Sequence, residues 1–175
     1  MAQPLVRYYL AASLDGFIGG PDGDVSWLEP YPAESLGFDE FLDGIDTIVM
    51  GRASYEQVLG FGAWPYGDKR TIVLTSRRLV NTPSGVETWG GDAGTLVAEV
   101  RSRAGRDIWL FGGAKTAKLF LDRGLVDRIE LFVVPILIGQ GIPLFEAGPG
   151  QHKLHLQTAT PRAQGVVQLV YALGG

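Results

Sequence analysis

The chain has 175 residues, of which 46% are hydrophobic and 19% charged, so its length and composition predict one globular domain over residues 1–175. Its formal net charge of −4 argues against a general nucleic-acid binder, which would carry a basic surplus. It contains no cysteine, which excludes disulfides, zinc–thiolate sites and a cysteine nucleophile. We see no membrane-spanning run and no signal peptide, and we therefore expect a cytoplasmic protein without membrane partners.

Residues 5–12 form the first apolar run and predict a strand, which ends at the turn pair Asp15-Gly16. A Gly- and Pro-rich segment follows over residues 19–32. It is too long for a hairpin turn, and ordered loops of this length often carry function. Helical spacing of apolar residues then predicts a short helix over residues 38–43.

Strands and helices alternate through the middle of the chain. Consecutive apolar residues, typical of strands covered on both faces, occur at 47–50, 71–75 and 108–111. Helices are predicted at 53–59, 95–103 and 114–122. After these, strand-like runs at 127–138, 154–158 and 166–173 follow one another without a helix signal. The order predicts an α/β fold with a mainly parallel sheet, helices on both faces and an antiparallel C-terminal edge.

The junction between the strand at 108–111 and the next helix is the strongest local signal. Gly112-Gly113 fills it, and glycines let a phosphate approach the unpaired N–H groups of a helix start. Lys115 and Thr116 add a charge and a hydroxyl. A tight turn without a ligand remains an equal alternative, because neither the Walker loop nor the G-x-G-x-x-G fingerprint is present.

Two other strand ends have a similar chemistry. Met50-Gly51-Arg52 is followed by Ser54, and residues 74–78 end a strand with hydroxyls and two arginines. Taken singly, each is explained by an ordinary strand exit with solvated charges. Together they would line one rim of a parallel sheet, which is where ligands bind in open α/β sheets. Arginines at such a rim suit a phosphate group.

These segments carry a family resemblance. The chain resembles the dihydrofolate reductase superfamily, and within it the reductase domain of riboflavin biosynthesis in a stand-alone form. The residues that carry it are SLDGFI at 13–18, DTIVMGRASYE at 46–56, FGGA at 111–114 and PILIGQGIPLF at 135–145. The resemblance implies a three-layer dihydrofolate reductase-like fold, a cis peptide in the Gly-Gly turn and NADPH as the cofactor.

The resemblance also implies roles for individual residues toward the cofactor. It assigns four groups: the cofactor phosphates to Gly51, Arg52, Ala53 and Ser54; the adenosine 2′-phosphate to Thr75, Ser76 and Arg77; the pyrophosphate to Gly112, Gly113, Ala114, Lys115 and Thr116; and the nicotinamide to Ala11, Ala12 and Ile18.

Dihydrofolate reductases carry a substrate carboxylate on the helix after the active-site loop. The candidates for this catalytic acid are Asp39 and Glu34, and Glu34 would share a face with Phe38 if the helix reached back through Gly37. Solvated acids in a first helical turn are the alternative. Trp27 and Phe38 are candidates for the substrate-binding wall, with a plain core role as the alternative for Trp27.

The residues and the resemblance together predict an NADPH-dependent oxidoreductase acting on a small heterocycle. By resemblance the substrate is 5-amino-6-(5-phosphoribosylamino)uracil of riboflavin biosynthesis. A dihydrofolate or pterin reductase is the first alternative, and a non-catalytic nucleotide-binding module is the second. A phosphoribosyl group would require basic residues at the pocket mouth, such as Lys69, Arg70 or Lys153. We expect no metal, and a homodimer formed through residues 127–145.

Overall fold

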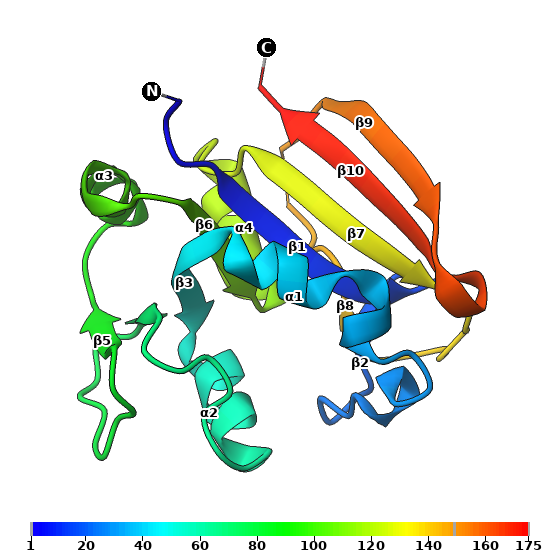
Figure 1. Cartoon of the computed structure of the whole chain (residues 1–175), viewed down its shortest axis with the longest axis horizontal. Helices are drawn as coiled ribbons and strands as arrows, with labels where there is room; N and C mark the ends of the chain where they lie inside the picture. Colours follow the sequence, from blue (N-terminus) through cyan, green and yellow to red (C-terminus); the bar gives the residue numbers. More distant parts are fainter. Residues whose placement is uncertain (1, 149, 175) are drawn as a thin grey trace.

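The computed structural model describes residues 2–148 and 150–174, and it is built around one eight-stranded sheet in the order β5-β4-β3-β6-β1-β7-β10-β9 (Figure 1). The six strands from β5 to β7 run parallel, and β10 and β9 continue the sheet in antiparallel pairing. The strands are β1 (Val6–Ser13), β3 (Ile45–Gly51), β4 (Arg70–Leu74), β5 (Val86–Trp89), β6 (Asp107–Gly112), β7 (Arg128–Val134), β9 (Leu154–Pro161) and β10 (Val167–Leu173). The predicted fold class, a mainly parallel sheet with an antiparallel C-terminal edge, is confirmed.

The sheet has a hydrophobic core on each face, because neighbouring residues of a strand point to opposite sides. Tyr8 belongs to the core under α3 (Ala93–Arg103) and α4 (Ala114–Asp122), whereas Tyr9 belongs to the core under α1 (Phe38–Asp43). The second core is rich in aromatic rings, and Tyr9 stacks on Phe41 with centroids 3.8 Å apart. These three layers are those expected for the fold.

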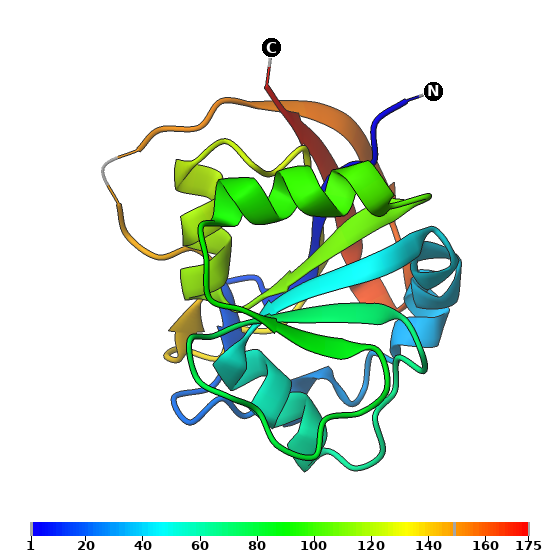
Figure 2. The ribbon, with the colours of Figure 1, turned by 90° about the vertical axis from the view of Figure 1, so that its left-hand side faces the viewer.

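The helix α2 (Arg52–Gly60) follows the carboxyl end of β3, at the end of the sheet opposite both chain termini (Figures 1 and 2). A two-stranded sheet of β2 (Phe17–Gly19) and β8 (Ile142–Pro143) lies near the same end. Short 3₁₀ turns, η1 (Ser26–Leu28), η2 (Ala33–Leu36) and η3 (Ala163–Gly165), complete the connections. No helix in the described part of the chain is long and apolar enough to cross a membrane.

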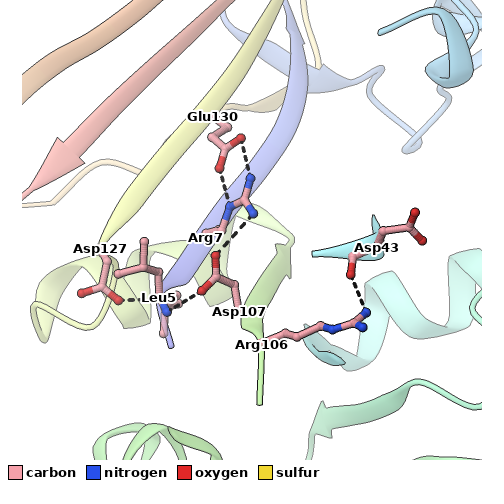
Figure 3. Close-up of polar contacts among 8 residues, drawn as sticks. Leu5, Arg7, Asp43, Arg106, Asp107, Asp127 and Glu130 are labelled. Atoms are coloured by element: carbon pink, nitrogen blue, oxygen red, sulfur yellow. Dashed lines mark hydrogen bonds and ion pairs between the residues drawn. The ribbon is translucent and has the colours of Figure 1, made fainter. Parts of the chain in front are cut away.

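A network of charges fixes the amino ends of the central strands (Figure 3). Arg7 on β1 donates to both carboxylate oxygens of Glu130 on β7, at 2.5 and 3.0 Å, and lies 3.4 Å from Asp107 on β6. Asp107 and Asp127 also accept backbone N–H bonds from Leu5 and Val6. Three adjacent strands are thereby tied at one end, which sets the positions of their carboxyl ends at the other.

The strand run predicted over residues 127–138 is shorter in the structure. β7 ends at Val134, because Pro135 has no N–H for the ladder. The backbone then turns, and Ile136 accepts a hydrogen bond from the Leu14 N–H at 2.9 Å. The short strands β2, β5 and β8 were not predicted, since they have two to four residues and no extended alternation.

Candidate active site

The glycine junctions of β3 and β6 meet at the carboxyl rim of the sheet. Gly51 ends β3, and a Cβ on it would lie 2.6 Å from Thr116 Oγ1 in the first turn of α4. A Cβ on Gly113 would lie 3.6 Å from Ser54 Oγ in α2. The peptide between Gly112 and Gly113 is cis, as the resemblance implied. The structure therefore brings together five of the residues assigned to the cofactor phosphates.

Unpaired hydrogen-bond donors gather at this junction. Neither α2 nor α4 has a side chain capping its N-terminus, so the first N–H groups of both helices are left for a ligand or for water. Arg52 binds Glu56 through Nε at 2.7 Å, while its Nη1 is buried without a partner among the described residues. Of the other assigned residues, Ala53 and Lys115 are exposed and Ala114 is buried. An anionic group would satisfy these donors.

The residues assigned to the 2′-phosphate follow β4, the neighbour of β3. Thr75 pairs with β5 through its N–H, which donates to Trp89 at 3.0 Å, and its hydroxyl accepts from the Arg77 N–H at 3.1 Å. Ser76 and the Arg77 side chain are exposed. Within residues 2–148 and 150–174, no carboxylate forms an ion pair with Arg77. Arg77 therefore keeps its charge available at the rim.

A cavity of about 330 Å³ opens on the α1 side of the sheet. Ala11 of β1 and Phe132 of β7 are register partners and form part of its floor. The loop between β2 and α1 supplies much of its wall. The described residues that line it are Tyr9, Ala11, Val25, Leu28, Glu29, Tyr31, Pro32, Ala33, Leu36 and Phe132, and Glu29 is the only charged one among them.

The three residues assigned to the nicotinamide do not lie together at the cavity. Ala11 lines the cavity, as a contact with a bound ring would require. Ala12 is buried, and by strand alternation its side chain points to the opposite face. Ile18 lies half-buried in β2. Only Ala11 of the three therefore has its side chain at the cavity.

Neither predicted acid reaches the cavity. Gly37 adopts φ 81° between η2 and α1, so the helix starts at Phe38 and does not reach back to Glu34. The condition for Glu34 and Phe38 to share a helical face is not met. Both Glu34 and Asp39 are exposed, and neither is among the lining residues. Glu29, which the sequence interpretation missed, is exposed as well, but it is the carboxylate among the residues that line the cavity.

The two predicted wall residues pack into the aromatic core instead. Trp27 is half-buried against it, with its Nε1 buried and without a partner in the described chain. The Phe38 ring lies between Tyr9 and Trp109, with centroids 6.1 and 5.6 Å away. Neither is among the residues that line the cavity, and their role toward a substrate stays a prediction.

Asp15 fastens the loop after β1 to the segment after β7. Its carboxylate accepts from the Ser13 hydroxyl at 2.6 Å and from the N–H groups of Ile138 and Gly139 at 3.2 and 2.8 Å. The bond from Ser13, followed by the two backbone bonds, lowers the pKa of Asp15 against the opposing effect of desolvation. The loop that leads to the cavity wall is thereby anchored at its start.

The basic residues considered for the pocket mouth lie elsewhere. Lys69 donates to the Ile45 carbonyl at 2.8 Å, at the amino end of β3. Arg70 pairs with Glu87 and Glu99 at 2.6 and 3.2 Å. Lys153 precedes β9 and is exposed. A separate cavity of about 230 Å³, lined by Lys118 and His152 among others, contains none of the predicted site residues.

The open parallel sheet, the paired glycine junctions and the adjoining cavity define an α/β protein of the dihydrofolate reductase-like fold. The chain belongs to the RibD C-terminal domain family, whose sequence pattern matches residues 4–168. The resemblance seen in the sequence is thus confirmed.

Similar proteins support this membership. YwjB of Bacillus subtilis, described as an uncharacterized protein, is 33% identical over 165 residues, covering 93% of this chain and 94% of YwjB. The crystal structure of a putative riboflavin biosynthesis protein from Shewanella sp. PV-4 has a TM-score of 0.86 and 27% identity, covering 98% of this chain and 99% of that one. Dihydrofolate reductase from Enterococcus faecalis, complexed with NADP(H), has a TM-score of 0.70 and 18% identity, covering 99% and 98%, and shows the fold alone.

Proposed function

We propose that this protein is an NADPH-dependent reductase of a small heterocyclic substrate. The observation that carries the proposal is the rim itself: the glycine junctions of β3 and β6 adjoin each other, and β1, next to β6, carries Ala11 into a cavity. A dinucleotide cofactor needs both features: glycines that let its phosphates approach the backbone closely, and a cavity that accepts its reactive ring. The similarity to proteins of riboflavin biosynthesis supports a reductase over a binding module.

The chain's own residues fit this cofactor. The helix starts behind Gly51 and Gly113 would donate N–H groups to the pyrophosphate, and the partnerless Nη1 of Arg52 would add a charged donor. Ser76 would hold the 2′-phosphate together with Arg77, which forms no ion pair among the described residues, and this phosphate distinguishes NADPH from NADH. When bound, NADPH supplies a hydride.

The cavity suits a flat ring held by one carboxylate. Phe132 and Ala11 offer an apolar floor, and residues of the loop between β2 and α1 form the wall around it. We propose that Glu29, in place of Asp39 and Glu34, accepts hydrogen bonds from N–H groups of the ring and positions the ring for proton transfer. The family favours 5-amino-6-(5-phosphoribosylamino)uracil as the substrate. A carboxylate at the cavity supports a pterin or dihydrofolate as the second candidate.

Direct binding followed by turnover tests the proposal. NADPH and NADH are titrated separately, and NADPH oxidation is then followed with the uracil compound and with dihydrofolate side by side. We expect tighter binding of NADPH and turnover of one heterocycle. Equal affinity for both cofactors would contradict the cofactor assignment. Tight NADPH binding without turnover of either heterocycle would favour the non-catalytic module.

We also propose that the protein is a homodimer. The edge strand β9 is exposed along nearly its whole length, and it carries Leu154 and Leu156 on the surface. Leu137 and Phe145, in the segment after β7, are exposed as well. Long exposed edges with apolar side chains are normally covered in soluble proteins, and a second copy of the chain would cover this one.

A further inference from the structure

The floor of the cavity continues into a polar row along the sheet. Ala11 on β1 is the register partner of Phe132 on β7, Phe132 is the partner of Gln168 on β10, and Gln168 is the partner of Thr160 on β9. Residues in register across a sheet present their side chains on the same face. Two cavity residues are therefore followed directly by two polar residues on the same surface.

Arg162 lies over this row. It follows β9 directly, and its N–H pairs with the Val166 carbonyl across the turn. Its Nε donates to Gln168 Oε1 at 2.9 Å, and its Nη2 donates to the same oxygen. Gln168 is itself buried, with 9% of its surface exposed, so its amide is a fixed support. The guanidinium is thus held on the cavity side of the sheet.

The charge of Arg162 is not neutralised by a neighbour. In the part of the chain that the structure describes, no carboxylate forms an ion pair with it. Burial is the main cause that raises the pKa of the cavity residue Tyr9, with a smaller contribution from Glu130, and the charges of Arg162 and Arg7 oppose it. Arg162 therefore acts electrostatically on a residue of the cavity lining.

We propose that Arg162, supported by Gln168, binds an anionic arm of the substrate whose ring occupies the cavity. The arm is a phosphate monoester or a carboxylate, because the guanidinium N–H groups that do not bind Gln168 can donate to either. The cavity lining itself has a carboxylate and no cation among its described residues, so an anionic arm needs a partner beyond it. This inference rests on the proposed function, since it names the class of substrate for the same site.

The competing explanation is that Arg162 only stabilises the turn between β9 and β10. That turn contains Gln164 at φ 58° and Gly165 at φ 79°, and a side-chain bond across it would help to hold it. A purely structural role predicts lower thermal stability and equally weaker binding of all ligands. An anion-binding role predicts a loss confined to ligands that carry the arm.

The test compares matched ligands by equilibrium binding in the presence of NADPH analogues that cannot react. One pair is the phosphoribosylaminouracil and its dephosphorylated form, and the other is dihydrofolate and a dihydropterin without the glutamate tail. The variants are Arg162→Gln, which removes the charge, and Arg162→Lys, which keeps it. Arg128→Gln is the control, because Arg128 begins β7 on the same face as Phe132 but at the amino end of the strand.

We expect Arg162→Gln to weaken the ligand with the arm by roughly 10- to 100-fold, the range for a hydrogen bond to a charged group. Binding of the ligand without the arm should change less than about 2-fold, Arg162→Lys should recover part of the loss, and Arg128→Gln should match the wild type. The pair that responds identifies the arm as phosphate or carboxylate.

Three results would overturn the inference. The first is a wild type that binds both members of each pair equally, and the second is an equal loss for both members in Arg162→Gln. In either case the ring and NADPH still bind, so the proposed function survives. A wild type that binds neither NADPH nor any of the rings is the third, and it contradicts the proposed function as well.

Discussion

Replacing Gly51 by alanine should damage the proposed cofactor site through one contact. Gly51 has φ −74° and ψ 161°, which alanine adopts without strain. The added Cβ would lie 2.6 Å from Thr116 Oγ1, whereas Cβ atoms essentially never come within 3.0 Å of a neighbour. The Thr116 side chain must therefore rotate away, or α4 must shift from β3. Overpacking of this kind costs about 1–3 kcal/mol in unfolding free energy.

Urea denaturation of the protein without cofactor measures this cost, and a second substitution identifies its cause. Thr116→Ala removes the conflicting atom, so the variant Gly51→Ala/Thr116→Ala should regain about 1 kcal/mol relative to the additive expectation. Thr116→Val is the matched control, because it keeps both branches and should give no such relief. If the effects of Gly51→Ala and Thr116→Ala simply add, the close packing of β3 on α4 is not what excludes a side chain at residue 51.

Four further predictions follow from the site and the surface. Arg77→Ala should weaken NADPH by about 10-fold or more and leave NADH within about 2-fold, and a parallel loss of both in titrations would contradict the 2′-phosphate assignment. Glu29→Gln should lower turnover by about 10²- to 10⁴-fold with unchanged NADPH affinity, and full activity would remove Glu29 from the reaction. The lowered pKa of Asp15 means that its carboxylate stabilises the fold above the ordinary carboxyl pKa, and that this contribution disappears as the pH falls through the lowered value. Asp15→Asn should therefore flatten the acid side of the stability profile measured between about pH 2 and pH 6, and an unchanged slope would show that the loop anchor carries no such stability. Sedimentation at micromolar concentration should give a dimer, and a monomer would show that β9 is left uncovered.

The fold could be predicted from the sequence because its signals are local. Runs such as 48–50 are apolar at consecutive positions, and that pattern is typical of a strand covered on both faces. The glycines at 51, 112 and 113 are also a local signal. They stand at the junctions where a strand ends and a helix begins. Pro135 carries an equally local signal, because its missing N–H ends the ladder of β7 at Val134. The apolar residues at 136–138 continue the strand pattern beyond it, which is why the sequence predicts a longer strand.

The substrate side could not be predicted in the same way, because its residues meet only through tertiary structure. Glu29 lies in an irregular loop, and its neighbours in the sequence do not distinguish it from Glu34. Only the structure shows that Gly37 separates η2 from α1 and that Glu29 lines the cavity. Arg162 is more than a hundred residues from Ala11 in the sequence, and they share a face only through the register of four strands. Sequence periodicity predicts the longer strands but not the order in which strands pair.

The cofactor side and the substrate side of the proposed site differ in how readily their residues can be substituted. The cofactor side depends on backbone geometry and on glycines such as Gly51, where a single methyl group would collide with Thr116. The proposed substrate side consists of a loop and of side chains at the edge of the sheet, where Glu29 and Arg162 are exposed. Exposed loop positions accept substitution far more readily than close-packed strand ends. We therefore infer that members sharing the glycine junctions can reduce different rings, and that the residues corresponding to Glu29 and Arg162 are where their substrates diverge. Exchanging the loop over residues 25–36 between this protein and a relative should transfer the preference for one ring over another. The affinity for NADPH should stay unchanged. A transfer of NADPH affinity with the loop would contradict the separation of the cofactor side from the substrate side.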